Sequence, residues 1–282
     1  MQGLAGKTLV ISGASRGIGL AIAVRAARDG ANVAILAKTD QPHPKLPGTI
    51  HSAAEEIEQA GGKALPIVCD IRDDDATAAA VKQAAEHFGG IDICVNNASA
   101  INLIGTEMLS MKRYDLMHQV NGRGTFLLSK LCIPYLKKAD NPHVLNISPP
   151  LDWNIRWFKP HAAYTLAKYS MSVYAWAMAE EFRSAGIAFN CLWPHTPIAT
   201  AAIQNMPGAE PMVEASRTPQ IMGDAAWHVL TKPSREFTGQ FCIDDLVLQQ
   251  AGHTDFAQYQ HEPGAKLLPD FFLPDDLPDI VQ

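Results

Sequence analysis

The sequence has no excess of basic residues, and this excludes one broad class of function. Its 282 residues include 23 Lys and Arg against 29 Asp and Glu, so the formal net charge is −6 at pH 7. A protein that binds nucleic acid needs a basic surface to neutralise phosphates. We therefore expect no nucleic-acid partner.

Long apolar runs are also absent. No stretch approaches the roughly 18 residues that a bilayer-spanning helix needs. The N-terminal residues MQGLAGKTLVISG lead directly into a predicted strand, without the layout of a signal peptide. We predict a protein without a membrane span that resides in the cytoplasm.

Cysteine is scarce and does not form metal-binding motifs. None of the five cysteines belongs to a CxxC pair, and four lie in strand-like runs; the five are Cys69, Cys94, Cys132, Cys191 and Cys242. We expect them to serve as small core hydrophobes in a reducing compartment, and we expect no metal site.

What the chain does have is a regular alternation of apolar runs and helical patterns, with 47% hydrophobic residues. Seven apolar runs have the length of strands, at 7–12, 31–37, 63–70, 91–98, 143–148, 187–193 and 239–244. Helical patterns lie at 19–30, 49–61, 73–88, 107–138 and 161–184. This order predicts a doubly wound parallel sheet with helices on both faces, in one Rossmann-like domain over residues 1–245.

Residues 246–282 differ in composition, because they are rich in Pro and Asp. We expect a C-terminal tail that packs on the domain and is anchored by Phe271, Phe272 and Leu273. The alternative is a partly disordered tail.

A glycine-rich loop separates the first predicted strand from the first predicted helix. Gly13, Gly17 and Gly19 lie in the stretch SGASRGIG. Glycines allow a tight turn and a close approach to a pyrophosphate, and the helix N-terminus offers free N–H groups to it. Between a strand and a helix, this spacing predicts a dinucleotide site.

Charges near the end of the second strand bear on the choice of cofactor. An acidic residue there usually holds the adenosine ribose of NAD, but here the strand ends in Lys38, and Arg16 is close in the fold. Two cations suit the 2′-phosphate of NADP. Asp40 argues for NAD, the less favoured cofactor. We expect Asp70 to meet the adenine ring or, alternatively, to cap the next helix.

A tyrosine and a lysine are spaced for acid–base chemistry. Tyr164 and Lys168 are four residues apart and share one face of a predicted helix. A cation about 4 Å from a phenol favours phenolate and lowers its pKa by up to roughly 3 units. We expect this pair to act as a general acid–base.

With these residues in order, the chain resembles the short-chain dehydrogenase/reductase family. The matching motifs are Gly13-x3-Gly17-x-Gly19, Asn96-Asn97-Ala98, Asn121 in VNGRGTF and Tyr164-x3-Lys168. The stretches AKTDQPHPKLPGTI, NISPPL and PDFFL resemble one subgroup of the family. The resemblance implies hydride transfer between a nicotinamide cofactor and a carbonyl/alcohol pair. It also implies a homodimer or homotetramer paired through long helices.

The resemblance further implies roles for matching residues. Tyr164 is the implied acid–base, Lys168 the residue that lowers its pKa and holds the ribose, and Asn121 the residue that orders a water. The implied cofactor-binding residues are Gly13, Ser15, Arg16, Gly17, Ile18, Gly19, Lys38, Asp70, Ile71, Asn97, Ala98, Tyr164, Lys168, Pro194 and Thr196. For His195, where the family usually has glycine, we expect a packing role, with an extra proton donor as the alternative.

The catalytic serine of the family is in question here. It usually lies about 13 residues before the tyrosine, whereas Ser148 lies 16 residues before it (164 − 148) and Pro149 lies 15 before it (164 − 149). If the loop 151–160 holds the extra residues, Pro149 takes the serine position. We predict that Ser148 is a partial donor to the substrate carbonyl, helped by Asn154, His161 or a water. A site without a competent donor is the alternative.

Bulky apolar residues surround this motif. They are Trp153, Trp157 and Phe158, Trp193 at the end of the sixth strand, and Met206 and Met212 in the stretch 194–219, where the family carries its substrate lid. Such a wall suits an apolar substrate, although the aromatic residues could equally pack under the tail.

We therefore predict an NADP-dependent oxidoreductase that acts on a carbonyl or alcohol of a hydrophobic substrate, of steroid, fatty or terpenoid type. The alternative is a nucleotide-binding protein with weak or no turnover that responds to a lipid or cofactor.

Overall fold

The computed structural model describes residues 3–44, 46–205 and 208–282. Seven strands form one parallel sheet, as predicted, and their order in the sheet is β3-β2-β1-β4-β5-β6-β7. They are β1 (Thr8–Ser12), β2 (Asn32–Ala37), β3 (Lys63–Val68), β4 (Ile93–Asn96), β5 (His143–Ile147), β6 (Ala188–Trp193) and β7 (Phe241–Ile243). The strand order reverses between β1 and β4. Doubly wound proteins bind their ligands at the carboxyl ends of the strands at such a point.

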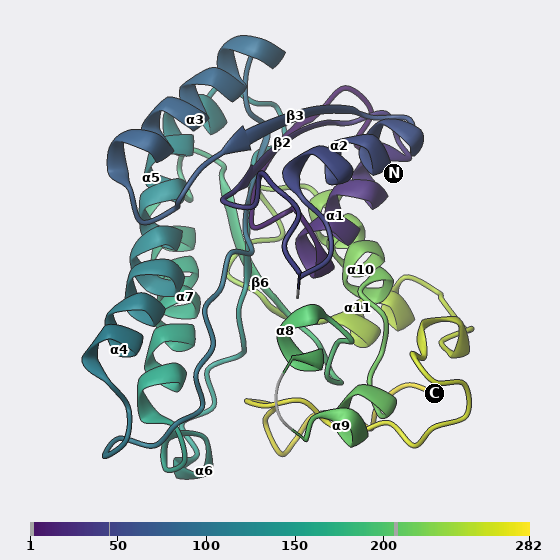
Figure 1. Cartoon of the computed structure of the whole chain (residues 1–282). Coiled ribbons are helices and arrows are strands. Elements are labelled where there is room, and N and C mark those ends of the chain that lie inside the picture. The colour runs from purple at the N-terminus through teal and green to yellow at the C-terminus, as the bar shows by residue number, and fades with distance from the viewer. Residues whose placement is uncertain (1–2, 45, 206–207) are drawn as a thin grey trace.

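Helices cover both faces of the sheet, as Figure 1 shows. One face carries α1 (Gly17–Ala27), α2 (Ile50–Gln59), α10 (Gln220–Leu230) and α11 (Asp244–Gln250). The other carries α3 (Asp74–Phe88), α4 (Met111–His118), α5 (Gly124–Leu136) and α7 (Ala162–Glu181). Short helices α6 (Ile155–Phe158), α8 (Ala201–Gln204), α9 (Glu210–Glu214) and η2 (Ala257–Tyr259) lie in the connections.

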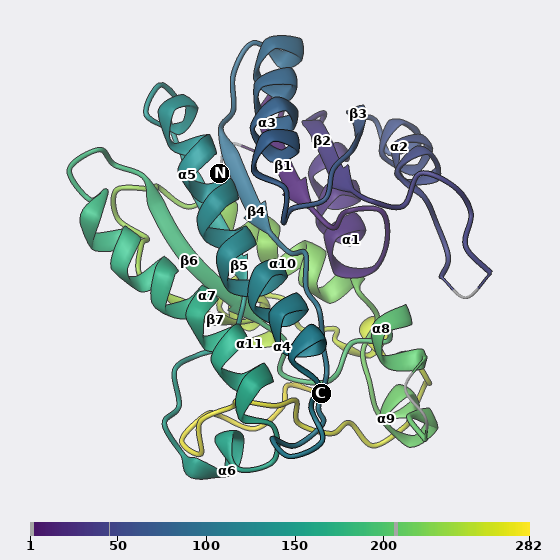
Figure 2. The ribbon, with the colours of Figure 1, turned by 60° about the vertical axis from the view of Figure 1, so that its left-hand side comes forward.

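The region predicted as helical over 107–138 is two helices joined by a π-helical turn, η1 (Gln119–Arg123). Figure 2 shows α4 leading into α5 beside α7. Helices α10 and α11 were not predicted. Helix α10 packs closely on α1. A Cβ on Gly223 would lie only 2.7 Å from the carbonyl oxygen of Ala21, so the absence of a side chain at Gly223 permits this approach.

The C-terminal segment lies against the end of the molecule that carries α8 and α9, as both ribbon views show (Figure 1, Figure 2). Phe272 is fully buried, Leu273 is nearly so, and Phe271 is half-buried. Arg156 forms an ion pair with Asp275 at 2.5 Å and donates to the carbonyl oxygen of Leu273 at 3.0 Å. Residues 271–275 thus pack against the rest of the chain.

The described part of the chain contains neither a membrane-spanning helix nor a cluster of metal ligands, and its cysteines are unpaired. Over residues 3–44, 46–205 and 208–282, no helix combines the length and the apolar character that crossing a membrane requires. In the same ranges no cluster of side chains could hold a metal ion. All five cysteines are buried and free.

Candidate active site

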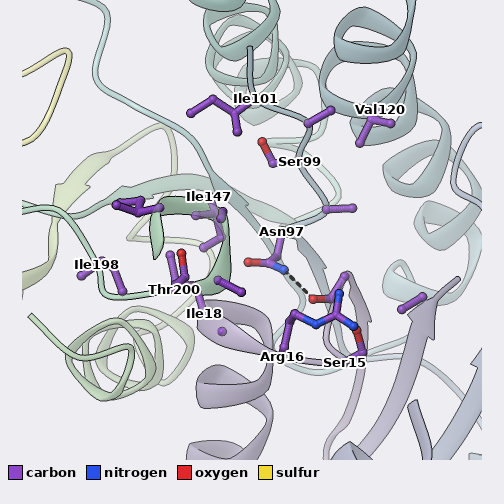
Figure 3. A pocket seen from close by; sticks show the side chains of 18 of the residues that line it. Ser15, Arg16, Ile18, Asn97, Ser99, Ile101, Val120, Ile147, Ile198 and Thr200 are labelled. Carbon is purple, nitrogen blue, oxygen red and sulfur yellow. Dashed lines mark hydrogen bonds between the residues drawn. The ribbon is translucent and has the colours of Figure 1, made fainter. Parts of the chain in front are cut away.

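One cavity of about 520 Å³ lies at the carboxyl ends of the central strands. Its walls come from the loop after β1, the ends of β2 and β3, the segments after β4 and β6, helix α7 and the C-terminal segment. Figure 3 shows Ser15 and Arg16 at one end, Ser99 and Ile101 at the other, and Asn97 between them. This is the crevice in which doubly wound folds bind ligands.

The glycine-rich loop packs so closely that side chains would not fit. Gly13 has φ of +68°, and a Cβ there would lie 3.0 Å from the Cα of Ala98. A Cβ on Gly19 would lie 2.5 Å from the Nδ2 of Asn97, which itself donates to the carbonyl oxygen of Gly13 at 3.0 Å (Figure 3). Gly19 thus packs against Asn97 and the backbone of Gly13 and Ala14, and it does not line the cavity. The first turn of α1 does line it, and its free N–H groups suit a phosphate.

Two cations lie where β2 ends. Lys38 lines the cavity with 61% of its side chain exposed. Arg16 also lines the cavity, and it donates to the carbonyl oxygens of Pro47 at 2.7 Å and Gly48 at 2.9 Å. Arg16 belongs to the glycine-rich loop, and the backbone of the loop after β2 thus fixes its guanidinium group.

Acidic residues near these cations are paired, and one of them pairs with Lys38 itself, whose Nζ lies 3.8 Å from Asp70 Oδ2. Asp40 lies 2.7 Å from His51 Nε2 and does not line the cavity. Asp70 does line it, and the hydrogen bonds from Arg72 hold its pKa below the usual range. Helix α3 is capped by Asp73, which accepts from the N–H of Ala76 at 2.9 Å. The alternative role of Asp70 as the cap is therefore wrong.

Tyr164 and Lys168 both line the cavity from α7. Lys168 donates from Nζ to the carbonyl oxygen of Ile147 at 2.7 Å, and burial lowers its pKa to about 7. Burial, and to a smaller extent Asp270, raise the pKa of Tyr164. This is the opposite of the predicted shift, because desolvation of the phenol dominates and the lysine faces the end of β5.

Asn121 is fully buried in the π-helical turn η1. Its Oδ1 accepts from the N–H of Ala100 at 2.8 Å, and its Nδ2 donates to the carbonyl oxygen of Ala100 at 3.0 Å. Asn121 does not line the cavity, but it fixes Ala100, which does. Such turns are frequent at functional sites. The role of Asn121 in ordering a water stays a prediction.

Ser148 is fully buried and does not line the cavity, whereas the residue before it, Ile147, does. Within the described residues, the Oγ of Ser148 has no hydrogen-bond partner. The hydroxyl lies near the thiol of Cys191 on β6. Burial raises the pKa of this thiol, and the side chain of Ser148 opposes the rise. Pro149 follows, and its carbonyl oxygen accepts from Ser172 Oγ at 2.6 Å. The structure therefore places Ser148 apart from the cavity of Tyr164.

The two other side chains considered as donors are also engaged elsewhere. Asn154 caps α6 and accepts from the N–H of Arg156 at 3.1 Å. His161 is buried, with Nδ1 lying 3.1 Å from Thr165 Oγ1. Neither residue lines the cavity.

After β6, Pro194 lines the cavity but Thr196 does not. Thr196 is fully buried and donates to the carbonyl oxygen of Pro197 at 3.3 Å. His195 is also buried, and its Nδ1 lies 2.8 Å from a carboxylate oxygen of Asp245, which pairs in turn with Arg217 at 3.0 Å. His195 thus belongs to a buried ionic cluster outside the cavity.

The apolar wall differs in part from the predicted one. Trp193 and Met212 line the cavity, whereas Met206 lies outside the described residues. Trp157 packs under the tail against Phe272, with ring centroids 5.7 Å apart. Phe158 joins the same cluster, and Trp153 is 68% exposed. The apolar lining that was not predicted includes Leu36, Leu46, Ile101, Leu103, Leu116, Val120, Ile147, Ile198, Ile203 and Phe271.

A sequence profile of the short chain dehydrogenase family matches residues 7–209. The chain belongs to the short-chain dehydrogenase family. The family predicted from the motifs is therefore confirmed.

Known relatives of this short-chain dehydrogenase agree with the assignment. Hydroxysteroid dehydrogenase-like protein 2 from Danio rerio is 58% identical over 279 residues, which is 99% of this chain and 66% of the relative. The chain thus spans just under two thirds of that relative's length. The crystal structure of a putative dehydrogenase from Xanthomonas campestris is 55% identical, with a TM-score of 0.94, covering 97% of this chain and 100% of that one.

A more distant structure contains a cofactor. A metagenomic short-chain oxidoreductase crystallised in complex with NADP is 26% identical, with a TM-score of 0.70, and covers 85% of this chain and 97% of that chain.

The C-terminal segment of this short-chain dehydrogenase, beyond the matched residues, adds two residues to the cavity that were not predicted, Asp270 and Phe271. Burial raises the pKa of Asp270 to about 7. The only signal in the sequence is an aspartate directly before a pair of aromatic residues in PDFFL.

Proposed function

We propose that this chain is an NADP-dependent oxidoreductase that moves a hydride between the cofactor and a carbonyl or alcohol group on a hydrophobic substrate. One observation carries the proposal. A single cavity is lined by the phosphate loop at Gly13 and Gly17, by the cation Lys38, and by the acid–base pair Tyr164 and Lys168.

The residues present fit the proposed cofactor. The first turn of α1 faces the cavity with free N–H groups for the pyrophosphate. Lys38 and Arg16 provide positive charge for a 2′-phosphate, and Asp40, the residue that would favour NAD, is turned to His51. The NADP complex of the related oxidoreductase supports the same choice. When bound, the nicotinamide supplies or accepts the hydride.

Tyr164 provides the proton in this proposal. Because its pKa is raised, the phenol is protonated near neutral pH and can donate to a carbonyl oxygen that receives a hydride. Lys168 lines the same cavity one helical turn along α7, and its positive charge, when it is protonated, favours the phenolate that is left. Asn121 supports the opposite wall through Ala100.

The apolar wall supports a hydrophobic substrate. Ile101, Leu103, Leu116, Ile198 and Met212 line the cavity together with its polar groups. A mainly apolar pocket with a few convergent polar groups is the usual form of a small-molecule site. A substrate of steroid, fatty or terpenoid type fits this description.

The position of Ser148 favours the second candidate, a nucleotide-binding protein with weak or no turnover. A titration with NADPH followed by addition of decanal separates the two. The oxidoreductase binds NADPH and then oxidises it in the presence of decanal, whereas Tyr164→Phe binds NADPH but does not oxidise it. NADPH binding without oxidation for any apolar aldehyde or ketone tested would favour the second candidate.

We also propose that two or four copies associate through α5 and α7. Phe126 on α5 is 43% exposed and Trp176 on α7 is 61% exposed. Exposed aromatic side chains on adjacent helices are typical of interfaces. The cytoplasmic location stays a prediction.

A further inference from the structure

The cavity lacks the polar group that the catalytic serine provides in related enzymes. Pro149 has no hydroxyl, and Ser148 is buried away from the cavity. Apart from the phosphate loop, the ends of β2 and β3, and Thr200, which lies beside Gly17, the polar side chains that line the cavity together with Tyr164 are Ser99, Asn97, Lys168 and Asp270. Asn97 and Lys168 are already bonded to backbone carbonyls, at 3.0 Å and 2.7 Å. Ser99 and Asp270 are therefore the candidates for contact with a substrate oxygen.

Asp270 is held in place by backbone contacts on both sides. Its N–H donates to the carbonyl oxygen of His195 at 3.0 Å, in the loop after β6. The next residue, Phe271, accepts from the indole Nε1 of Trp193 at 2.8 Å through its carbonyl oxygen. These two bonds join the segment to the same stretch of chain that lines the cavity at Trp193 and Pro194.

Phe272 anchors the turn that presents Asp270. Its ring is fully buried among Trp157, Tyr164, Tyr169 and Trp193, with ring centroids 5.5 to 6.0 Å away. Among the described non-glycine residues it alone has a positive φ, of 68°. A bulky residue in that region costs conformational energy, and such strain is found where surrounding structure fixes a functional turn. Asp270 thus lies on a wall of the cavity that the packing of Phe272 holds in place.

The charged and titratable groups around Asp270 come from three elements. Lys168 and Tyr164 face it from α7, and each of them interacts electrostatically with its carboxyl group. His195 contributes only its backbone, because its ring is paired with Asp245. His161 packs against the adjacent Phe271. Within the described ranges, no basic side chain lies within 4 Å of the Asp270 carboxylate, so it is not committed to an ion pair.

We propose that the Asp270 carboxyl group contacts the reacting oxygen of the substrate beside Tyr164, in the role that a serine hydroxyl has in related enzymes. This inference rests on the proposed function and adds a residue from outside the family match at 7–209. A carboxylic acid donates a hydrogen bond to a carbonyl oxygen, and a carboxylate accepts one from an alcohol.

The protonation of Asp270 then sets which ligand the cavity prefers. Burial raises the pKa of Asp270 to about 7, opposed by the N–H of Phe271 and by Lys168. Below that pH the neutral acid favours a ketone. Above it the carboxylate repels the ketone oxygen and favours an alcohol. The affinity for a ketone should therefore fall as the pH rises from 6 to 8.

The test uses complexes that cannot react. The protein is saturated with NADP⁺, and calorimetry measures the binding of acetophenone and of ethylbenzene, which has the same shape without the carbonyl oxygen. We expect Asp270→Ala to weaken acetophenone binding about 3- to 10-fold, the value of one hydrogen bond, and to leave ethylbenzene unchanged. Asp270→Asn keeps an N–H donor, so it should retain the affinity and lose the part of the pH dependence between 6 and 8 that Asp270 contributes, while Lys168, with a pKa of about 7, still titrates in the variant.

Three control variants make the outcome specific. Asp276→Ala changes an exposed aspartate of the same segment and should have no effect. Ser99→Ala tests the other candidate donor. An effect of Ser99→Ala or Tyr164→Phe on acetophenone, with none of Asp270→Ala, would overturn the assignment to Asp270 and leave the proposed function standing. If NADP⁺ does not bind, the proposed function is wrong; if NADP⁺ binds but no variant distinguishes the two ligands, the assignment to Asp270 is wrong and the proposed function stands.

Discussion

The amino group of Lys168 donates a hydrogen bond of 2.7 Å to the carbonyl oxygen of Ile147, the last residue of β5. The side chain of Ile147 lines the cavity, and the next side chain, Ser148, lies against Cys191. Successive side chains at the end of a strand face opposite ways, so both residues cannot face the substrate. The hydroxyl of Ser148, in the stretch NISPPL, therefore faces away from the cavity.

Ser148→Ala should therefore change turnover little. A serine that stabilised the reacting oxygen would cost about 10²–10³ in kcat when removed. We expect a loss of less than about threefold, because Ser148 is fully buried and off the cavity. Stability should not fall, because removing a buried hydroxyl that has no hydrogen-bond partner among the described residues leaves no other polar group unsatisfied. Steady-state kinetics with NADPH and an apolar aldehyde provide the measurement.

The matched variant is Pro149→Ser, which restores a hydroxyl at the position that the family spacing indicates. Pro149 does not line the cavity itself, but its side chain falls on the same side as Ile147 in the alternation along the strand end, so we expect the new hydroxyl to raise kcat modestly. A hundredfold loss in Ser148→Ala, without any gain in Pro149→Ser, would show that Ser148 is the catalytic serine after all.

Lys38→Asp should reduce the preference for NADPH over NADH. Lys38 lines the cavity at the end of β2, where a 2′-phosphate would meet its charge. We expect the wild type to bind NADPH at least about tenfold more tightly, and the variant to lose most of this ratio. Fluorescence titration of both cofactors measures it. Lys82→Asp makes the same change of charge on α3, at a side chain 69% exposed, and should leave the ratio unchanged. Equal affinities in the wild type would refute an NADP preference.

The sequence predicted the sheet well, because buried parallel strands are continuous apolar runs between helical patterns. It placed the glycine-rich loop between β1 and α1, where the loop directly follows a strand, and it placed Tyr164 on the helix between β5 and β6. It did not predict α10, which is preceded by the Pro-rich stretch 194–219 and depends on contact with α1 for its burial.

The candidate site was harder to predict where distant segments meet. Asp270 reaches the cavity only because Phe272 is buried beneath it and His195 accepts its N–H. The raised pKa of Tyr164 also follows from burial, whereas the sequence shows only the spacing to Lys168. Long-range packing and desolvation decide both features, and neither leaves a periodic pattern in the sequence.

Asp244→Asn should change how stability depends on pH. Burial raises the pKa of Asp244 to about 7 in the folded protein, and an aspartate in an unfolded chain titrates near pH 4. Between these values the folded state holds a proton that the unfolded state has lost, so the free energy of unfolding decreases as the pH rises toward 7. Asparagine does not titrate. We expect the decrease between pH 5 and 8 to be about 1–3 kcal/mol smaller in the variant.

Urea unfolding at the two pH values measures this difference. Asp255→Asn, at an exposed aspartate, should follow the wild type. If Asp244→Asn loses as much stability as the wild type between pH 5 and 8, Asp244 is not protonated in the folded protein.

Trp176→Glu should shift the protein toward a smaller assembly. Trp176 is 61% exposed on α7, and a charge at the centre of an apolar interface disfavours association. Size-exclusion chromatography with light scattering gives the mass of each species. Trp153→Glu, at a side chain 68% exposed near α6, should leave the assembly unchanged. A wild type that is monomeric at all concentrations would contradict the proposed pairing of α5 and α7.

The most direct test of the account follows the hydride itself. NADPH that carries two deuterium atoms at nicotinamide C4 is incubated with the protein and a set of apolar aldehydes and ketones, and mass spectrometry measures deuterium in the alcohol products. We predict one deuterium per alcohol with the wild type. Tyr164→Phe should bind NADPH within about twofold of the wild type and transfer label at least about 10²-fold more slowly. Tight NADPH binding by the wild type without deuterium in any alcohol would contradict the account.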